Sequence, residues 1–195
     1  MSESYPLLTL FASRLGAPLP GEASALLQQA KAADLPPGTT LLRAGECWQH
    51  LWWLERGLLR LYYLDRDGLA SNKNFYLEGA MLWPITPMLR HAPVHFWIEA
   101  LQPCRIWPLA WKDWHAAIGE FRPWRDWERQ ALAALLEEKM LREQQFLQCS
   151  ATERYLSLLA RQPDWIQRIP LRHLASYLGI TDVALSRIRR RLNPG

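Results

Sequence analysis

The chain has 195 residues, of which 49% are hydrophobic and 11% are aromatic. This length and composition allow a sizeable buried core in one or two domains and exclude an intrinsically disordered protein. The net charge is only +4, from 23 basic and 19 acidic residues. Any binding to nucleic acid must therefore depend on where the basic residues lie. They concentrate near the end of the sequence, where residues 187–191 include four arginines and no acidic residue.

Two short helices are predicted at the start of the chain. An apolar-periodic stretch after residue 5 is interrupted between Gly16 and Gly21, and Ala23 to Ala33 has the composition of a second helix. From Leu35 onward, short apolar runs alternate with Gly-containing turns. The clearest runs are 39–42, 51–54 and 58–64. Short strands at this spacing are typical of an antiparallel β-roll or barrel.

A long helix is predicted from Trp124 to about Gln148, after Pro123, which is favourable as a first helical residue. Before this helix, the sequence predicts a last strand at 107–109 and a short helix at 111–118. Apolar residues of the long helix recur at alternating spacings of three and four, the pattern of a coiled-coil seam. We assign dimerisation to Leu132, Leu136, Met140 and Leu147. The alternative is a single helix packed on its own roll.

The segment from Leu171 to Leu192 predicts two short helices with Gly179 at the bend and Thr181 as N-cap of the second helix. Two apolar faces that meet around a tight turn form a helix-turn-helix, which places its second helix in the DNA major groove. An ordinary helical hairpin with a solvated basic end is the alternative. Ser150 or Thr152 is expected to cap a preceding helix, after a hinge at 148–150.

Three motifs in this region resemble the DNA-binding unit of the Crp/Fnr family of bacterial transcription regulators: 169–171 (IPL), 175–181 (ASYLGIT) and 185–189 (LSRIR). The runs LPPGTTLLRAGE and LWWLERGLLRLYYLDRDG are similar to the opening of the family's sensor domain. The resemblance covers about 35–192. It implies an α+β chain with an antiparallel β-roll (a double-stranded β-helix, cyclic-nucleotide-binding-like), a long dimerisation helix and a C-terminal (winged) helix-turn-helix.

The expected domains are the sensor roll with its helical lead-in at 1–120, the dimerisation helix at 121–148 and the DNA-binding domain at 149–195. Only three residues follow Leu192, so we expect no substantial wing beyond the second helix. The expected partners are a two-fold-symmetric double-stranded DNA site and a second copy of the chain. The resemblance adds RNA polymerase as a further partner.

The resemblance also implies which residues contact DNA. Thr181 is expected at a phosphate, and Arg187 is expected to bind a guanine in a bidentate manner. The residues expected near bases or adjacent backbone are Asp182, Val183 and Ser186, and those expected at phosphates are Arg189, Arg190 and Arg191. Where relatives often carry Pro-Glu-Ser or Arg-Glu-Thr after the cap, this chain has Asp-Val-Ala, so its DNA site should differ from the familiar one.

Family members that bind a cyclic nucleotide use a Gly-Glu pair and an Arg followed by Ser or Thr. Aligned without gaps, these positions hold Trp83-Pro84 and Val94-His95, which supply neither the carboxylate nor the cation. We therefore expect a degenerate pocket that does not bind cyclic AMP, with Arg90 as the only nearby cation. The eleven tryptophans fit core packing, an aromatic ligand pocket, or rings that fill an old pocket.

The sequence also argues against metals, cofactors and catalysis. The three cysteines, Cys47, Cys104 and Cys149, are far apart and have no histidine at metal-ligand spacing. His91 and His95 do not have the spacing of a cupin metal centre, and no phosphate loop or nucleophile elbow is present. The N-terminus has no signal-like segment, and no apolar run is long enough to cross a bilayer.

We therefore expect a cytoplasmic protein that is not an enzyme and carries no cofactor. The sequence predicts a homodimeric DNA-binding transcription regulator of the Crp/Fnr type, not controlled by cyclic AMP. The alternative is a small-molecule-binding β-roll protein whose helical tail mediates protein contacts.

Overall fold

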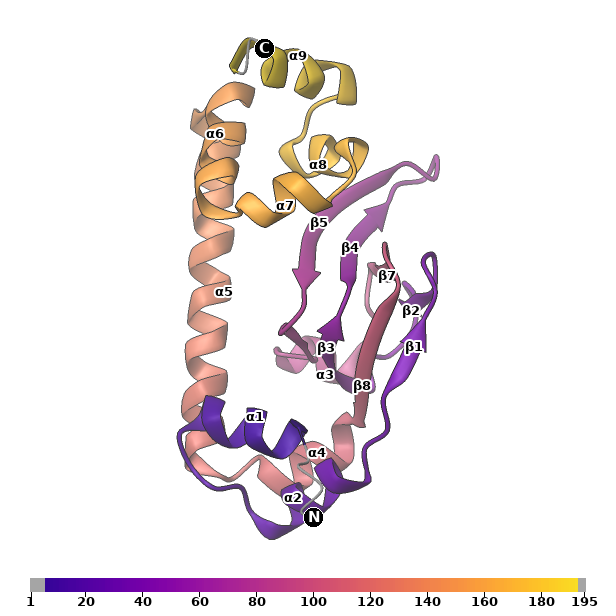
Figure 1. Cartoon of the computed structure of the whole chain (residues 1–195), viewed down its shortest axis with the longest axis vertical. Helices are drawn as coiled ribbons and strands as arrows, with labels where there is room; N and C mark the ends of the chain where they lie inside the picture. Colours follow the sequence, from indigo (N-terminus) through magenta and orange to yellow (C-terminus); the bar gives the residue numbers. More distant parts are fainter. Residues whose placement is uncertain (1–5, 193–195) are drawn as a thin grey trace.

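A computed structural model describes residues 6–192 as a β-roll with helices at both ends (Figure 1). The long helix α5 (Arg122–Gln148) runs from the end with the first helices to the end with the last ones (Figure 1). The strands are β1 (Ala33–Leu35), β2 (Thr40–Leu42), β3 (His50–Arg56), β4 (Leu58–Leu64), β5 (Ala70–Leu77), β6 (Met81–Leu82), β7 (Trp97–Ala100) and β8 (Cys104–Ala110). The other helices are α1 (Pro6–Leu15), α2 (Gly21–Gln29), α3 (Pro87–His91), α4 (Trp111–Ile118), α6 (Ala151–Arg161), α7 (Pro163–Arg168), α8 (Leu171–Leu178) and α9 (Asp182–Leu192).

The predicted antiparallel β-roll is confirmed. Its two four-stranded sheets have the orders β1-β8-β3-β6 and β2-β7-β4-β5. Strands β3 and β4 connect the two sheets directly, because each belongs to a different sheet and only Gly57 separates them. The core of the roll contains fully buried side chains from both sheets, such as Leu54, Leu59 and Ile98. Burial of this apolar area is the main stabilising contribution to the roll.

A second apolar cluster joins α1, α2, α4 and the start of α5 at the N-terminal end of the molecule. Trp114 and Trp124 are fully buried in it, and the Trp114 ring meets the edge of Phe11 with centroids 4.8 Å apart. Several of the tryptophans are therefore core residues, as the simplest interpretation of the sequence expected. Among the described residues, no helix has the length and apolarity that a bilayer crossing requires.

The prediction of one helix from Ala23 to Ala33 is wrong at its end. Helix α2 ends at Gln29, Ala30 has an extended backbone, and β1 begins at Ala33. Ala33 pairs with Ile106 at the edge of the first sheet. Ladder hydrogen bonds and contacts along β8 therefore override the helix propensity of this alanine-rich stretch.

The sequence pattern did not reveal β5. This strand contains Asn72, Lys73 and Asn74, residues that are depleted in strands. It forms nevertheless, because it pairs with β4 along its whole length and because the C-terminal helices pack on it. The pairing is irregular: Asn74 is opposite Leu61 and Asn72 is opposite Tyr62, so that Lys73 is the extra residue of a β-bulge.

The C-terminal helices α6–α9 share a core around Leu174 and Leu185, which are fully buried. This core also includes Leu58 of β4 and Phe75 of β5, so the C-terminal helices pack directly on the roll. Helix α6 begins with a capping box in which the Ser150 hydroxyl accepts from the Glu153 N–H at 3.3 Å, while the Glu153 carboxylate accepts from the Ser150 N–H at 2.7 Å. Of the two predicted caps, Ser150 is therefore the one used.

Candidate nucleic-acid interface and ligand pocket

The turn between α8 and α9 has the geometry of a helix-turn-helix. Gly179 ends α8 in the left-handed conformation, with φ +69°, and the Ile180 N–H closes the helix on the Ala175 carbonyl at 3.0 Å. A Cβ atom at Gly179 would lie 2.6 Å from the ring of Phe146 in α5, so both the backbone angle and the space require glycine. Thr181 then caps α9, because its hydroxyl accepts from the Ala184 N–H at 3.2 Å.

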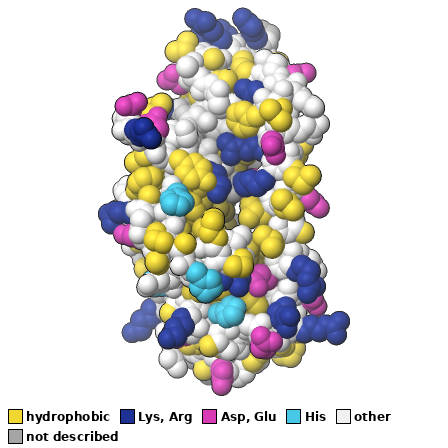
Figure 2. All heavy atoms as spheres, turned by 180° about the vertical axis from the view of Figure 1, so that it is seen from behind, with side chains coloured by type: hydrophobic (Ala, Val, Ile, Leu, Met, Phe, Trp, Pro, Cys, Tyr) yellow, Lys and Arg dark blue, Asp and Glu magenta, His cyan; other side chains and the backbone are white. Residues whose placement is uncertain are grey.

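Helix α9 buries one face and presents the other to solvent. Leu185 and Ile188 pack into the C-terminal core, whereas Val183 is 56% exposed on the opposite side. Most residues expected to contact DNA lie on this outer side or at the helix start. They are Thr181, Asp182, Val183, Arg187, Arg190 and Arg191, which are exposed, and Ser186, which is half-buried. Figure 2 shows basic side chains at the end of the molecule that α9 forms.

Arg189 differs from the other arginines of α9. Its Nη2 donates to the Ile166 carbonyl at 3.3 Å, and its guanidinium lies over the Tyr155 ring, 5.7 Å from the centroid. The side chain therefore packs α9 against α6 and the end of α7. This placement disagrees with the phosphate contact expected for Arg189, so the proposed DNA surface of α9 consists of its other residues.

A buried histidine lies where α8 meets the roll. His173 is only 8% exposed, and its Nδ1 accepts hydrogen bonds from Arg60 Nη1 at 3.3 Å and Asn72 Nδ2 at 3.4 Å. Arg60 also pairs with Glu99 at 3.0 Å. Burial, together with the charges of Arg60 and Arg172, lowers the pKa of His173 to about 4, against the opposite effect of Glu99. The imidazole is therefore neutral at pH 7, as its acceptor role requires.

Further polar contacts fix the helix-turn-helix on the roll. The Ser176 hydroxyl accepts from the Asn72 N–H at 3.0 Å and donates to the Ala70 carbonyl at 3.1 Å. The Arg142 guanidinium of α5 donates to the carbonyls of Lys73, at 2.7 Å, and Tyr177, at 3.0 Å. One side chain thus joins α5, β5 and α8. No sequence motif indicated this role, because it depends on three segments that are far apart in the chain.

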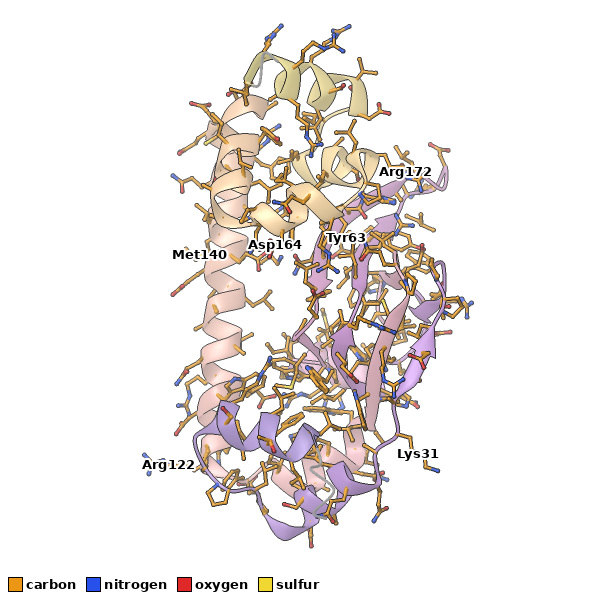
Figure 3. The ribbon with its side chains drawn as sticks, viewed as in Figure 1. Lys31, Tyr63, Arg122, Met140, Asp164 and Arg172 are labelled. Atoms are coloured by element: carbon orange, nitrogen blue, oxygen red, sulfur yellow. The ribbon has the colours of Figure 1, made fainter. Side chains whose placement is uncertain are left out.

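Helix α5 has two different faces. One stripe, which includes Leu135 and Glu138, faces the roll, whereas the predicted seam lies on the other side. The seam residues are exposed to the extents Leu132 42%, Leu136 59%, Met140 61% and Leu147 78%. In Figure 3, Met140 lies on the side of α5 that faces away from the roll. The helix therefore packs on its own roll and still presents an apolar stripe to solvent.

A pocket of about 550 Å³ lies between the roll and α5. Trp83, Val94 and His95 line it as expected, but Pro84 does not. The pocket is therefore not filled by tryptophan rings, which removes one of the three interpretations of the tryptophans.

The cations near this pocket differ from the expectation. Arg90 does not line it, because its guanidinium donates to the Pro84 carbonyl at 2.9 Å and pairs with Glu128. Lys73 of β5 and Lys139 of α5 line the pocket instead. Sequence reasoning missed both lysines, since β5 was not predicted and the contact between α5 and the roll could not be located.

No family model matches the sequence, and no curated protein matches it significantly. Solved structures are similar at low sequence identity. FixK2 from Bradyrhizobium japonicum is 19% identical with a TM-score of 0.70, and the match covers 84% of each chain. A protein from Eubacterium rectale, described as a transcriptional regulator of the Crp/Fnr family, is 17% identical with a TM-score of 0.70 over 89% of this chain and 83% of that one.

The c-di-GMP-responsive global regulator CLP from Xanthomonas campestris is 14% identical with a TM-score of 0.65, over 88% of this chain and 90% of CLP. The chain therefore has the fold of the Crp/Fnr transcription regulators.

Proposed function

We propose that this protein is a sequence-specific DNA-binding transcription regulator of the Crp/Fnr type that acts as a homodimer without control by cyclic AMP. The observation that most supports DNA binding is the outer face of α9, where Arg187, Arg190 and Arg191 are exposed and no acidic residue follows Asp182. Such a helix offers hydrogen-bond donors to bases and cations to phosphates. RNA polymerase is a further partner in this proposal.

On DNA, the residues of α9 and its cap would divide into three groups by their position. Thr181 and the N–H groups at the helix start would bind a phosphate, since the first turn of a helix favours negative charge. Val183 and Arg187 lie where a recognition helix meets base edges. Arg190 and Arg191 lie one turn later and would hold the flanking backbone.

The exposed stripe of α5 supports the homodimer. Leu132, Leu136, Met140 and Leu147 leave an apolar row in water that pairing with a second α5 would bury. The two copies of α9 would then be related by a two-fold axis, which predicts half-sites about one helical turn apart. We also propose the domain division 1–120, 121–148 and 149–195, with a hinge at 148–150, where Cys149 is extended between α5 and α6.

The independence from cyclic AMP is supported by four positions. Val94 and His95 stand where the family pattern has its phosphate-binding Arg and its partner, and Trp83 and Pro84 replace the Gly-Glu pair. None of these residues carries the permanent positive charge of the arginine that pairs with the phosphate in that pattern.

The test is a selection of random duplex DNA by the purified protein without added ligand, followed by salt titration of the best site. We expect recovery of a two-fold-symmetric sequence whose binding weakens steeply with salt. Binding that is absent or insensitive to salt would contradict the proposal. That result would favour the second candidate, a small-molecule-binding roll whose helical tail mediates protein contacts, which the pocket of about 550 Å³ also fits.

A further inference from the structure

Helix α9 presents an apolar side chain among the polar residues at the start of its outer face. Val183 is 56% exposed, and it does not belong to the C-terminal core that buries Leu185 and Ile188. Among the described residues of α9, the other exposed large apolar side chain is Leu192 at the far end, at 38%. The two methyl groups of Val183 are therefore available to a partner of this face.

The backbone beneath Val183 is fixed on both sides. The Thr181 hydroxyl accepts from the Ala184 N–H at 3.2 Å, and the Thr181 carbonyl accepts from the Leu185 N–H at 3.0 Å. Asp182 Oδ1 accepts from the Val183 N–H at 2.9 Å, so this carboxylate is engaged at the helix start. A β-branched side chain in a helix has one strongly preferred χ1 rotamer. The methyl groups of Val183 are therefore held in a defined position.

Val183 and Arg187 lie on the same side of α9. They are four residues apart, the spacing at which side chains are neighbours on a helix, and both are exposed. This spacing corresponds to about 6 Å along the helix axis, whereas stacked base pairs are about 3.4 Å apart. A helix in the major groove therefore brings the two side chains to base pairs no more than about two steps apart.

The major groove offers one kind of apolar group to such a side chain. All four bases present hydrogen-bond donors or acceptors there, and thymine adds its C5-methyl group. Against a polar edge, Val183 would displace water from donors and acceptors without replacing their hydrogen bonds, which is unfavourable. Against the methyl group, the same contact buries apolar surface on both partners. The contact therefore favours thymine over cytosine at the base that Val183 faces.

We propose that Val183 reads the 5-methyl group of a pyrimidine in each half-site, within about two base pairs of the guanine expected at Arg187. Thymine carries this group in ordinary DNA, and 5-methylcytosine presents the same methyl at the same ring position. Binding therefore responds to methylation of a cytosine placed there. The inference rests on the proposed function, in which α9 enters the major groove.

The test uses the DNA site selected by the full-length protein. Each thymine is replaced in turn by deoxyuracil, which lacks the methyl group and keeps every hydrogen-bonding group of thymine. Fluorescence anisotropy at one salt concentration gives the dissociation constants. We expect one thymine per half-site at which the replacement weakens binding about fourfold, the effect of one buried methyl group. Equal binding of all the uracil duplexes would overturn the proposal.

The complementary substitution adds a methyl group. At the same position, the T·A pair is replaced by a C·G pair with either cytosine or 5-methylcytosine. We expect cytosine to bind most weakly and 5-methylcytosine to bind about fourfold more tightly than cytosine. Both duplexes have the same hydrogen-bonding groups, so the difference reports the methyl group. Equal binding of the two would contradict the assignment.

Variants of α9 assign the effect to a residue. Val183→Ala should bind the thymine and uracil duplexes within about twofold of each other, and it should fold normally because the side chain is exposed. Leu192→Ala serves as the control, since it also shortens an exposed apolar side chain of α9, and it should keep the wild-type discrimination. A uracil effect that persists in full in Val183→Ala would overturn the role of Val183.

A third variant reverses the chemistry at this position. Val183→Glu supplies a carboxylate that can accept from the N4 amino group of cytosine. We expect it to prefer C·G over T·A at the same base pair by at least about fivefold. Retention of the thymine preference in this variant would show that the side chain at 183 does not face that base.

These measurements separate the inference from the proposed function. A protein that selects a DNA site but does not distinguish thymine from uracil would contradict the inference alone. A protein that selects no DNA site would contradict the proposed function, and the inference with it.

Discussion

Under the proposed function, the exposed arginines of α9 would have different roles on DNA although their chemistry is the same. Arg187 and Arg190 are both exposed arginines, but Arg187 lies nearer the helix start, where the proposed recognition helix would reach base edges. Thr181 and Gly179 could be assigned from the sequence because caps and left-handed turns depend on local chemistry. The packing role of Arg189 could not be assigned from the sequence, because its contact with Ile166 depends on how α7 packs against α9.

Arg187→Ala should reduce discrimination between the selected site and random DNA by about 1 to 3 kcal/mol. Arg190→Ala should weaken binding to both DNAs alike and make the salt dependence shallower by about one unit of slope. The measurement is the dissociation constant on both DNAs over a range of salt concentrations. Equal losses on both DNAs for Arg187→Ala would contradict its assignment to a base.

The buried His173 predicts a pH-dependent stability. Its pKa is near 6.5 when unfolded and about 4 in the fold, so the unfolded chain binds the proton more readily. The contribution of the neutral His173 to the free energy of unfolding is therefore complete above about pH 6.5. It falls as the pH drops toward 4, by up to about 3 kcal/mol. Arg60, Arg172, Glu99 and Asn72 are the groups that face it.

Urea denaturation between pH 7 and 4 measures this effect. The free energy of unfolding should fall more steeply in the wild type than in His173→Gln, which keeps a neutral polar side chain. Parallel pH profiles for the two proteins would show that His173 does not titrate in this window.

The elements differ in how far their sequence determines them. Helix α5 could be predicted because its composition, Pro123 and its apolar spacing all indicate one structure. Strand β5 could not be predicted, because Asn72, Lys73 and Asn74 have low strand propensity. Pairing with β4 and contacts with the C-terminal helices hold them in the strand. The sequence could predict only part of the pocket for the same reason. Lys73 and Lys139 both line it, but they are brought together by the fold and belong to no shared motif.

The apolar stripe of α5 predicts a dimer that one charge can disrupt. Met140→Glu places two carboxylates at the proposed seam of the dimer, which should raise its dissociation constant at least about tenfold. Leu141→Glu is the matched control, because Leu141 is also an exposed apolar residue of α5 but lies off the seam. Sedimentation equilibrium measures both variants. Dimers of equal strength in both would place the interface elsewhere.

At the scale of the whole molecule, the roll, α5 and the helix-turn-helix form one connected set of contacts. Arg142 bonds to β5 and α8, and Arg168 of α7 pairs with Glu78 at 2.6 Å. The pocket lies against the same strand and the same long helix. The pocket thus borders β5 and α5, two elements to which the C-terminal helices are also bonded.

In the proposed regulator, two copies of α9 would read two half-sites on one face of DNA. Hydroxyl-radical footprinting of the selected site with the full-length protein tests it most directly. We predict two protected regions related by two-fold symmetry, with centres about 10 base pairs apart or a multiple of that distance. A single protected region, or no protection above that given by random DNA, would contradict the proposed homodimeric DNA-binding function.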